Sequence, residues 1–268
     1  MSEGRCASIF GLSLMRKSSE TRAFFYDVLF RGPLFISVLF LSTVFLKFAN
    51  KEAGCTEAGH DIAAGQIEEE ADDANIDCTG KVAFGIRPSS VLTTLNAVAG
   101  LILAILLPIF GAIIDHTSYR KQCVMYCGAL FWLCNVLQIF TNAATWSLMV
   151  LVQGIFSSSA YTIHQTALFA YATEILDDLD KELGLMNAAV RVWELVTMLG
   201  FMIGVTILSA LLGLGDDVVG KSAVSQTVAS LVAVYPFIVV ARNLGDRPCL
   251  NEVRERVRIG VARIPAYS

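Results

Sequence analysis

Long apolar stretches alternate with short polar ones along most of the chain. The clearest runs from Ala97 to Ile114, eighteen residues without a charge. At the helical rise of about 1.5 Å per residue, it covers most of a hydrocarbon layer about 30 Å thick. Charged residues then occupy the stretch 115–121, and a second apolar stretch begins at Gln122. The pattern predicts two membrane-spanning helices joined by a charged turn.

Applied to the whole chain, the same pattern predicts an all-α membrane protein with six transmembrane helices. The expected spans are residues 33–49, 89–114, 122–140, 146–172, a fifth that includes 195–214, and 223–241. Pro33 suits the first turn of the first span. The expected division of the chain is a cytosolic N-terminal segment (1–32), a six-span transmembrane domain (33–241) and a basic cytosolic tail (242–268).

Composition supports a membrane protein. The chain of 268 residues is 55% hydrophobic and 16% charged, with a mean hydropathy of +0.61, which soluble domains rarely reach because their surfaces need polar residues. No phosphate-binding loop, metal-ligand spacing or nucleophile–base arrangement occurs. We therefore expect no enzyme, no metal, no cofactor and no nucleic-acid partner, and the lipid bilayer as surroundings.

The longest polar segment between spans is the acidic stretch 50–87, which contains Cys55 and Cys78. If this loop is lumenal or extracellular, a disulfide can close it, and the sequence leaves open whether one forms. Lys and Arg decide the orientation: the N-terminal segment, the turns at 115–121 and 174–184 and the tail hold 14, against 4 on the opposite side. By the positive-inside rule both termini are expected in the cytosol.

The charges of the 115–121 turn are placed unfavourably for their own helices. Asp115 ends one helix, where the macrodipole is negative, whereas Arg120 and Lys121 begin the next, where it is positive. Two interpretations stay open. Water and headgroups screen these charges, or they pair with one another or with other elements at the same membrane face.

The stretch 111–121, GAIIDHTSYRK, resembles the motif of the major facilitator superfamily, in which a glycine four residues before an aspartate closes span two and a basic pair opens span three. Here these residues are Gly111, Asp115, Arg120 and Lys121. His116 and Ser118 depart from the common arginine and glycine. Tyr119 before the basic pair makes this motif most similar to that of the autophagy-related vacuolar effluxer branch. Glu174, an acidic residue at the close of span four, resembles the same branch.

The resemblance implies the N-terminal half of a twelve-span transporter, built of two inverted three-helix repeats. Such transporters move small solutes by alternating access, and this branch exports amino acids from vacuoles. A vacuolar or lysosomal membrane is therefore expected, with the plasma membrane as the alternative. The resemblance also implies that Asp115 docks on a second half. Three cases are compatible with this expectation. The chain is a piece of a longer protein, or it assembles with a second six-span half or with copies of itself, or it is not a competent transporter.

Two other functions remain open besides transport. One is a membrane scaffold or interaction protein with a half-transporter fold that moves nothing. The other is an oligomeric six-span channel, although no re-entrant or pore-lining segment is evident between the spans.

Span four is the most polar span. The resemblance implies that it lines the substrate path, with Ser158, Tyr161 and Gln165 on one face at helical spacing. His164 is the one titratable residue in the middle of any predicted span, and intramembrane histidine suggests a role in binding substrate or protons. The alternative is that His164 is a neutral hydrogen-bonding partner and the polar residues hold helices together.

Arg191 and Glu194 are three residues apart, within reach of each other on one helix. They are either an ordinary interfacial ion pair, or they join Asp115, Arg120 and Glu174 in a cytosolic charge cluster that locks one conformation. Gly200 and Gly204, spaced as Gly-x-x-x-Gly, are expected to permit close helix packing.

Overall fold

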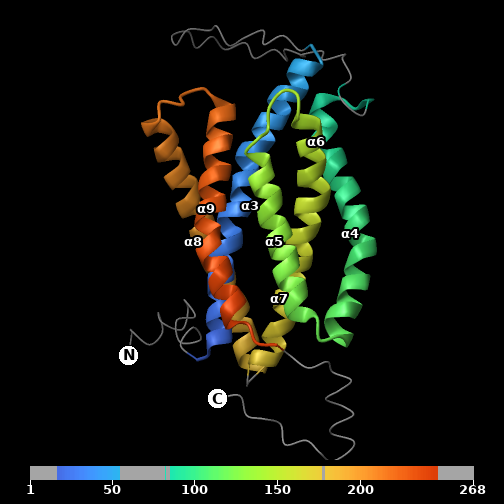
Figure 1. Cartoon of the computed structure of the whole chain (residues 1–268), viewed down its shortest axis with the longest axis vertical. Coiled ribbons are helices and arrows are strands. Elements are labelled where there is room, and N and C mark those ends of the chain that lie inside the picture. Colours follow the sequence, from blue (N-terminus) through green and yellow to red (C-terminus); the bar gives the residue numbers. More distant parts are fainter. Residues whose placement is uncertain (1–16, 55–81, 83–84, 177–178, 247–268) are drawn as a thin grey trace, which may run out of the picture.

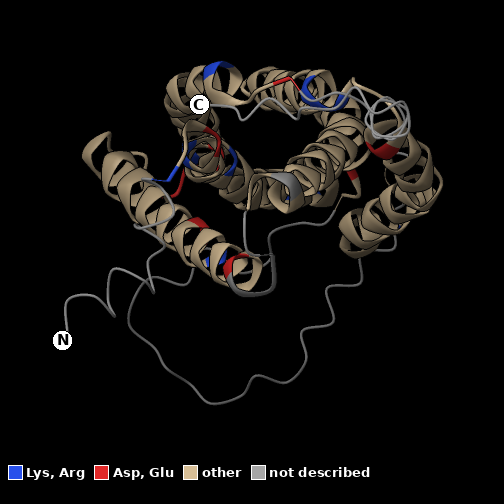
Figure 2. Cartoon of the chain, turned by 90° about the horizontal axis from the view of Figure 1, so that it is seen from below, with Lys and Arg blue, Asp and Glu red and all other residues tan. Residues whose placement is uncertain are grey.

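The computed structural model describes residues 17–54, 82, 85–176 and 179–246. In this part of the chain the secondary structure is helical and contains no strand. The described helices form six rods. They stand side by side (Figure 1), and few of their residues are coloured as charged when they are seen from below (Figure 2). Cys55 and Cys78 lie outside the described residues, so their pairing stays a prediction.

The first helix is longer than predicted. Helix α3 extends over Ser19–Glu52, and the Ser18 side chain caps it by accepting from the Thr21 N–H. The prediction that Pro33 lies in the first helical turn is therefore wrong, since the helix begins fourteen residues earlier. Asp27 and Arg31 do not end the helix, because they neutralise each other at i,i+4 spacing, and Pro33 lies inside it, as membrane helices tolerate.

The next two rods form the predicted hairpin. The short 3₁₀ helix η2 (Pro88–Ser90) leads into α4 (Val91–His116), and α5 follows over Arg120–Gln138. The fourth rod is one continuous element with three labels. It begins as α6 (Trp146–Leu151), widens into the π-helical turn η3 (Val152–Ser157) and continues as α7 (Ser158–Ile175).

The last two rods are α8 (Leu179–Leu211) and α9 (Val218–Asn243). Both pack against α3 (Figure 1), and α9 also packs against α5, where Trp132 Nε1 donates to the Ser230 oxygen at 2.9 Å. The end of α9 reaches the start of α3, where the Gly245 N–H donates to Glu20 Oε1 at 3.2 Å. The first and last described helices therefore begin and end at the same end of the bundle, as an even number of spans requires.

Four of the described helices are long and apolar enough to cross a membrane: Ser19–Glu52, Pro88–His116, Glu182–Leu211 and Val218–Asn243. The other two described rods, α5 and α6–η3–α7, are not among these four. The all-helical membrane class is thus confirmed, whereas six crossings remain a proposal.

Candidate functional site

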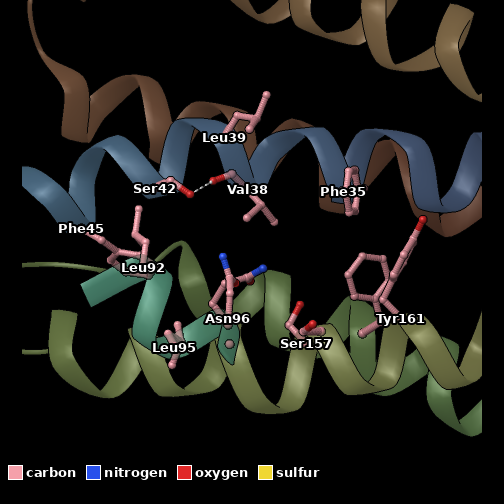
Figure 3. A pocket seen from close by; sticks show the side chains of 14 residues that line it. Phe35, Val38, Leu39, Ser42, Phe45, Leu92, Leu95, Asn96, Ser157 and Tyr161 are labelled. Carbon is pink, nitrogen blue, oxygen red and sulfur yellow. Dashed lines mark hydrogen bonds between the residues drawn. The ribbon is translucent and has the colours of Figure 1, made fainter. Parts of the chain in front are cut away.

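A pocket of about 250 Å³ lies between α3, α4 and the fourth rod. Figure 3 shows the side chains of Asn96, Ser157 and Tyr161 facing α3 across it. Uncharged polar residues on α4, η3 and α7 meet apolar residues of α3 here. Its uncharged polar lining residues include Asn96, Gln153, Ser158 and Tyr161, and Phe35 and Leu39 are its most exposed apolar ones.

The π-helical turn shapes one wall of this pocket. Gly154 in η3 lies so close to Leu95 of α4 that a Cβ there would overlap the leucine side chain. Gln153 reaches Gln138 of α5 through a short amide–amide hydrogen bond. The wider turn, a feature frequent at functional sites, thus brings α4 close and leaves backbone and polar side chains at the pocket.

Tyr161 joins the pocket to a set of buried charges. Its ring stacks on Phe35, with centroids 5.1 Å apart, and lines the pocket. Its hydroxyl lies 3.4 Å from both Arg31 Nη1 and Glu194 Oε1. A molecule that contacts this ring is therefore one side chain away from the ion pairs of the interior.

Four charged residues form a continuous chain of ion pairs behind Tyr161. Asp27 Oδ2 accepts from Arg31 Nε at 2.7 Å, and Arg31 Nη1 donates to Glu194 Oε1 at 2.8 Å. Glu194 Oε2 accepts from Arg191 Nη1 at 2.7 Å. Asp27 and Arg31 are wholly buried, whereas the Arg191 side chain is 60% exposed. This series of ion pairs thus leads from the core to the surface.

His164 lies at the buried end of this series of ion pairs. Its Nε2 lies 2.7 Å from Asp27 Oδ1, and its Nδ1 lies 2.8 Å from the backbone oxygen of Val124 on α5. Gly128 makes room for the ring, because a Cβ there would lie 3.0 Å from Nδ1 and 2.8 Å from Phe237. The edge of Phe30 covers the imidazole, with centroids 5.7 Å apart.

The structure separates the four residues predicted for the substrate path. Ser158 and Tyr161 line the pocket. Gln165 lies against the guanidinium groups, and its amide oxygen accepts from Arg31 Nη1 at 2.9 Å in the orientation that matches donors with acceptors. His164 is wholly buried and does not line the pocket. Its contacts are with Asp27 and α5.

Arg191 and Glu194 are the predicted ion pair, but not an ordinary interfacial one. Glu194 is 5% exposed and bonds Arg31 with its second oxygen. Its partners beyond Arg191 are therefore charges of the first helix, not the turn residues Asp115 and Arg120.

The turn residues form a separate group. Arg120 folds back over α4, where its Nε and Nη2 donate to the Ile114 oxygen at 3.1 and 3.0 Å, and its guanidinium lies 5.6 Å from the Tyr171 ring centroid. A cation on the last carbonyls of a helix is favourable. The unfavourable placement expected for Arg120 is therefore relieved by the helix that precedes it.

The other motif residues lie at the surface of this hairpin. Lys121 Nζ is 3.7 Å from Asp246 Oδ2, just after α9. Asp115 and Tyr119 are exposed, and within the described residues the Asp115 carboxylate has no hydrogen-bond or ion-pair partner. A Cβ added at Gly111 would meet nothing within 4 Å. Glu174 lies on α7, but its side chain is outside the described part.

Sequence analysis did not identify Asp27 and Arg31 as residues of the site. They were assigned to the polar N-terminal segment because charges interrupt the apolar run there. One signal was available: an Asp and an Arg four residues apart on a helix neutralise each other. Treated as a neutral pair, they extend the apolar stretch back to Ala23.

The chain matches a known protein family. The family model described as vacuole effluxer Atg22 like matches residues 32–181, more than half of the chain. The matched stretch includes the pocket-lining parts of α3, α4, η3 and α7, and it ends before Arg191 and Glu194. Neither the curated proteins nor the solved structures compared with the chain gave a match.

Proposed function

Because the chain belongs to the vacuole effluxer Atg22-like family, we propose that it is the N-terminal six-helix half of a secondary transporter of the major facilitator type. It moves small solutes, for which amino acids are the first candidates, out of a vacuole or lysosome. The six rods serve as six crossings, arranged as two inverted three-helix repeats. In this proposal the division expected from the sequence is kept: a cytosolic N-terminal segment (1–32), an acidic lumenal loop (50–87) and a basic cytosolic tail (242–268).

The observation that carries this proposal is the pocket between α3, α4 and the fourth rod. Six uncharged polar residues line it: Ser42, Asn96, Gln153, Ser157, Ser158 and Tyr161. Polar groups in membrane helices are costly against lipid, so they face other protein or a water-filled path. Binding sites of such transporters lie near the midplane between helices. The pocket therefore supports solute binding.

Alternating access needs a second half, and the exposure and the position of Asp115 support one. Asp115 is exposed and without a described partner, although it adds negative charge at the C-terminal end of α4. Docked on the N-terminus of a helix in a second half, its charge becomes favourable. That second half is a further part of the protein or another six-helix chain, and the contact is made in one conformation and broken in the other.

The experiment is transport by the full chain reconstituted in proteoliposomes, with and without co-expression of a candidate second half. Exchange of a mixture of the twenty radiolabelled amino acids is measured for the wild type, Asp115→Asn and Ser158→Phe. We expect exchange by the wild type and its loss in Ser158→Phe, because the added ring fills the pocket. Asp115→Asn is expected to slow exchange without abolishing solute binding.

Thr166→Phe is the matched control for Ser158→Phe. Thr166 lies two turns further along α7, is exposed and does not line the pocket, so this variant keeps its exchange. If no preparation exchanges any solute, or if both phenylalanine variants exchange like the wild type, the transporter proposal fails. A scaffold role then gains support.

A further inference from the structure

We propose that Asp27 and His164 together form a proton-binding site and that the proton is the ion coupled to solute movement. The first part stands on the geometry of this chain. The second part rests on the proposed function, since coupling needs a transported solute. The contact joins α3 to α7, the two helices that also supply opposite walls of the pocket.

The partners of the imidazole fix how many protons the pair holds. The backbone oxygen of Val124 only accepts hydrogen bonds, so Nδ1, 2.8 Å away, carries a hydrogen. At the other side, Nε2 lies 2.7 Å from Asp27 Oδ1. A contact this short needs one hydrogen between the two atoms, because otherwise a nitrogen lone pair would face a carboxylate oxygen. The pair therefore holds one proton beyond neutral histidine and ionised aspartate, on either atom.

Charged, titratable and apolar groups of several helices surround the Asp27–His164 pair. From α3, Arg31 faces Asp27; from α8, Glu194 and Arg191 continue the chain; from α7 itself, Tyr161 lies beside Arg31. From α5 the thiol groups of Cys123 and Cys127 lie nearby, and α9 contributes the apolar ring of Phe237.

Without the extra proton, the formal charges of Asp27, Arg31, Glu194 and Arg191 cancel, and with it the set carries one positive charge. The proton thus holds the contact between α3 and α7 together. Its loss places the Nε2 lone pair against the carboxylate in a buried site, where such repulsion is strong.

Loss of the proton is therefore expected to separate α3 from α7 at this level. Because Phe35 of α3 and Tyr161 of α7 stack across the same two helices, the separation changes the pocket. The Tyr161 hydroxyl, beside Arg31 and Glu194, is the connection between a solute in the pocket and the buried charges. Proton binding and solute binding are coupled in this way through one helix pair.

Asp27→Asn is the sharpest test, because asparagine reproduces the protonated pair. Its amide N–H donates to Nε2, while its oxygen still accepts from Arg31 Nε. We expect this variant to fold and to keep a slower exchange of labelled amino acids that does not depend on a proton gradient. A tenfold proton gradient is expected to support up to about tenfold solute accumulation by the wild type, if one proton moves with each solute, and none by Asp27→Asn.

Asp216→Asn is the matched control, since Asp216 is exposed at the turn before α9, and it keeps the gradient response. If the wild type exchanges solute but does not respond to the proton gradient, coupling is excluded while the transporter proposal stands. If Asp27→Asn responds to the gradient like the wild type, the site is wrong.

A second measurement tests the site even if nothing is transported. In the full chain labelled with ¹⁵N-histidine, the His164 resonances are assigned by their absence in His164→Gln. The structure requires a hydrogen on Nδ1 at every pH at which the contact with Asp27 persists. An Nδ1 without a hydrogen in the folded protein, or a wild-type spectrum at neutral pH matching that of free neutral imidazole, would overturn the assignment.

Discussion

Arg31 Nη1 on α3 lies 2.8 Å from Glu194 Oε1 on α8, although 163 residues separate them in the chain. The two side chains are almost wholly buried, and Arg31 also bonds Asp27. One guanidinium thus neutralises two interior carboxylates and joins the first helix to the fifth rod. This relationship gives the first prediction on stability.

Arg31→Met is expected to lower the free energy of unfolding by about 3–5 kcal/mol, because it removes the cation shared by two buried carboxylates, which keep only Arg191 and His164 as partners. Arg22→Met is the matched control on the same helix. Arg22 is exposed, and such surface changes stay within about 0.5 kcal/mol. Reversible denaturation in mixed detergent micelles measures both. Equal effects would show that Arg31 is not the central cation of the interior.

Gly128→Ala is expected to cost about 1–3 kcal/mol, since its Cβ would press on Phe237 and the His164 ring. The backbone approach of α5 to α7 allows little relief there. Gly100→Ala on α4 is the control, because nothing lies within 4 Å of its Cβ, and alanine favours the helix. A Gly128→Ala protein as stable as Gly100→Ala would mean that α5 does not approach His164 this closely.

Arg120→Lys is expected to destabilise the α4–α5 hairpin by about 1–2 kcal/mol. Lysine keeps the charge but loses the two-pronged bond to the Ile114 oxygen and the flat contact with Tyr171. Lys121→Arg, at the adjacent position, retains its loose contact with the exposed Asp246 and should change stability by less than about 0.5 kcal/mol. Hydrogen exchange of the backbone at the C-terminal end of α4 locates the effect, and slower exchange in Arg120→Lys would contradict it.

Gly200→Ala and Gly204→Ala are expected to leave the six-helix chain intact and to raise its stability by up to about 1 kcal/mol each. A Cβ at either position meets nothing within 4 Å, so the close packing expected of this glycine pair does not occur among the described residues. Thermal unfolding in detergent tests this. A loss of more than about 1 kcal/mol would place a neighbouring helix against this face in the isolated chain.

The sequence alone determined the helical class, the polar fourth rod and the charged hairpin turn. These are local properties: the length of an apolar stretch and the spacing of polar residues depend only on neighbours along the chain. The same local logic paired Arg191 with Glu194, which the structure shows at 2.7 Å. It placed the start of the first helix too late, because Asp27 and Arg31 were counted as charges facing water.

Only the tertiary structure decided which charges meet. Asp27 and His164 lie 137 residues apart, and the bond between them depends on how α3, α5 and α7 pack, to which the missing Cβ of Gly128 contributes. The surroundings decide what each charge indicates. In water, Asp27 and Arg31 would mark the end of a span, whereas inside the bundle each needs a partner. That need is created by the surroundings of a residue, which its identity and spacing do not specify.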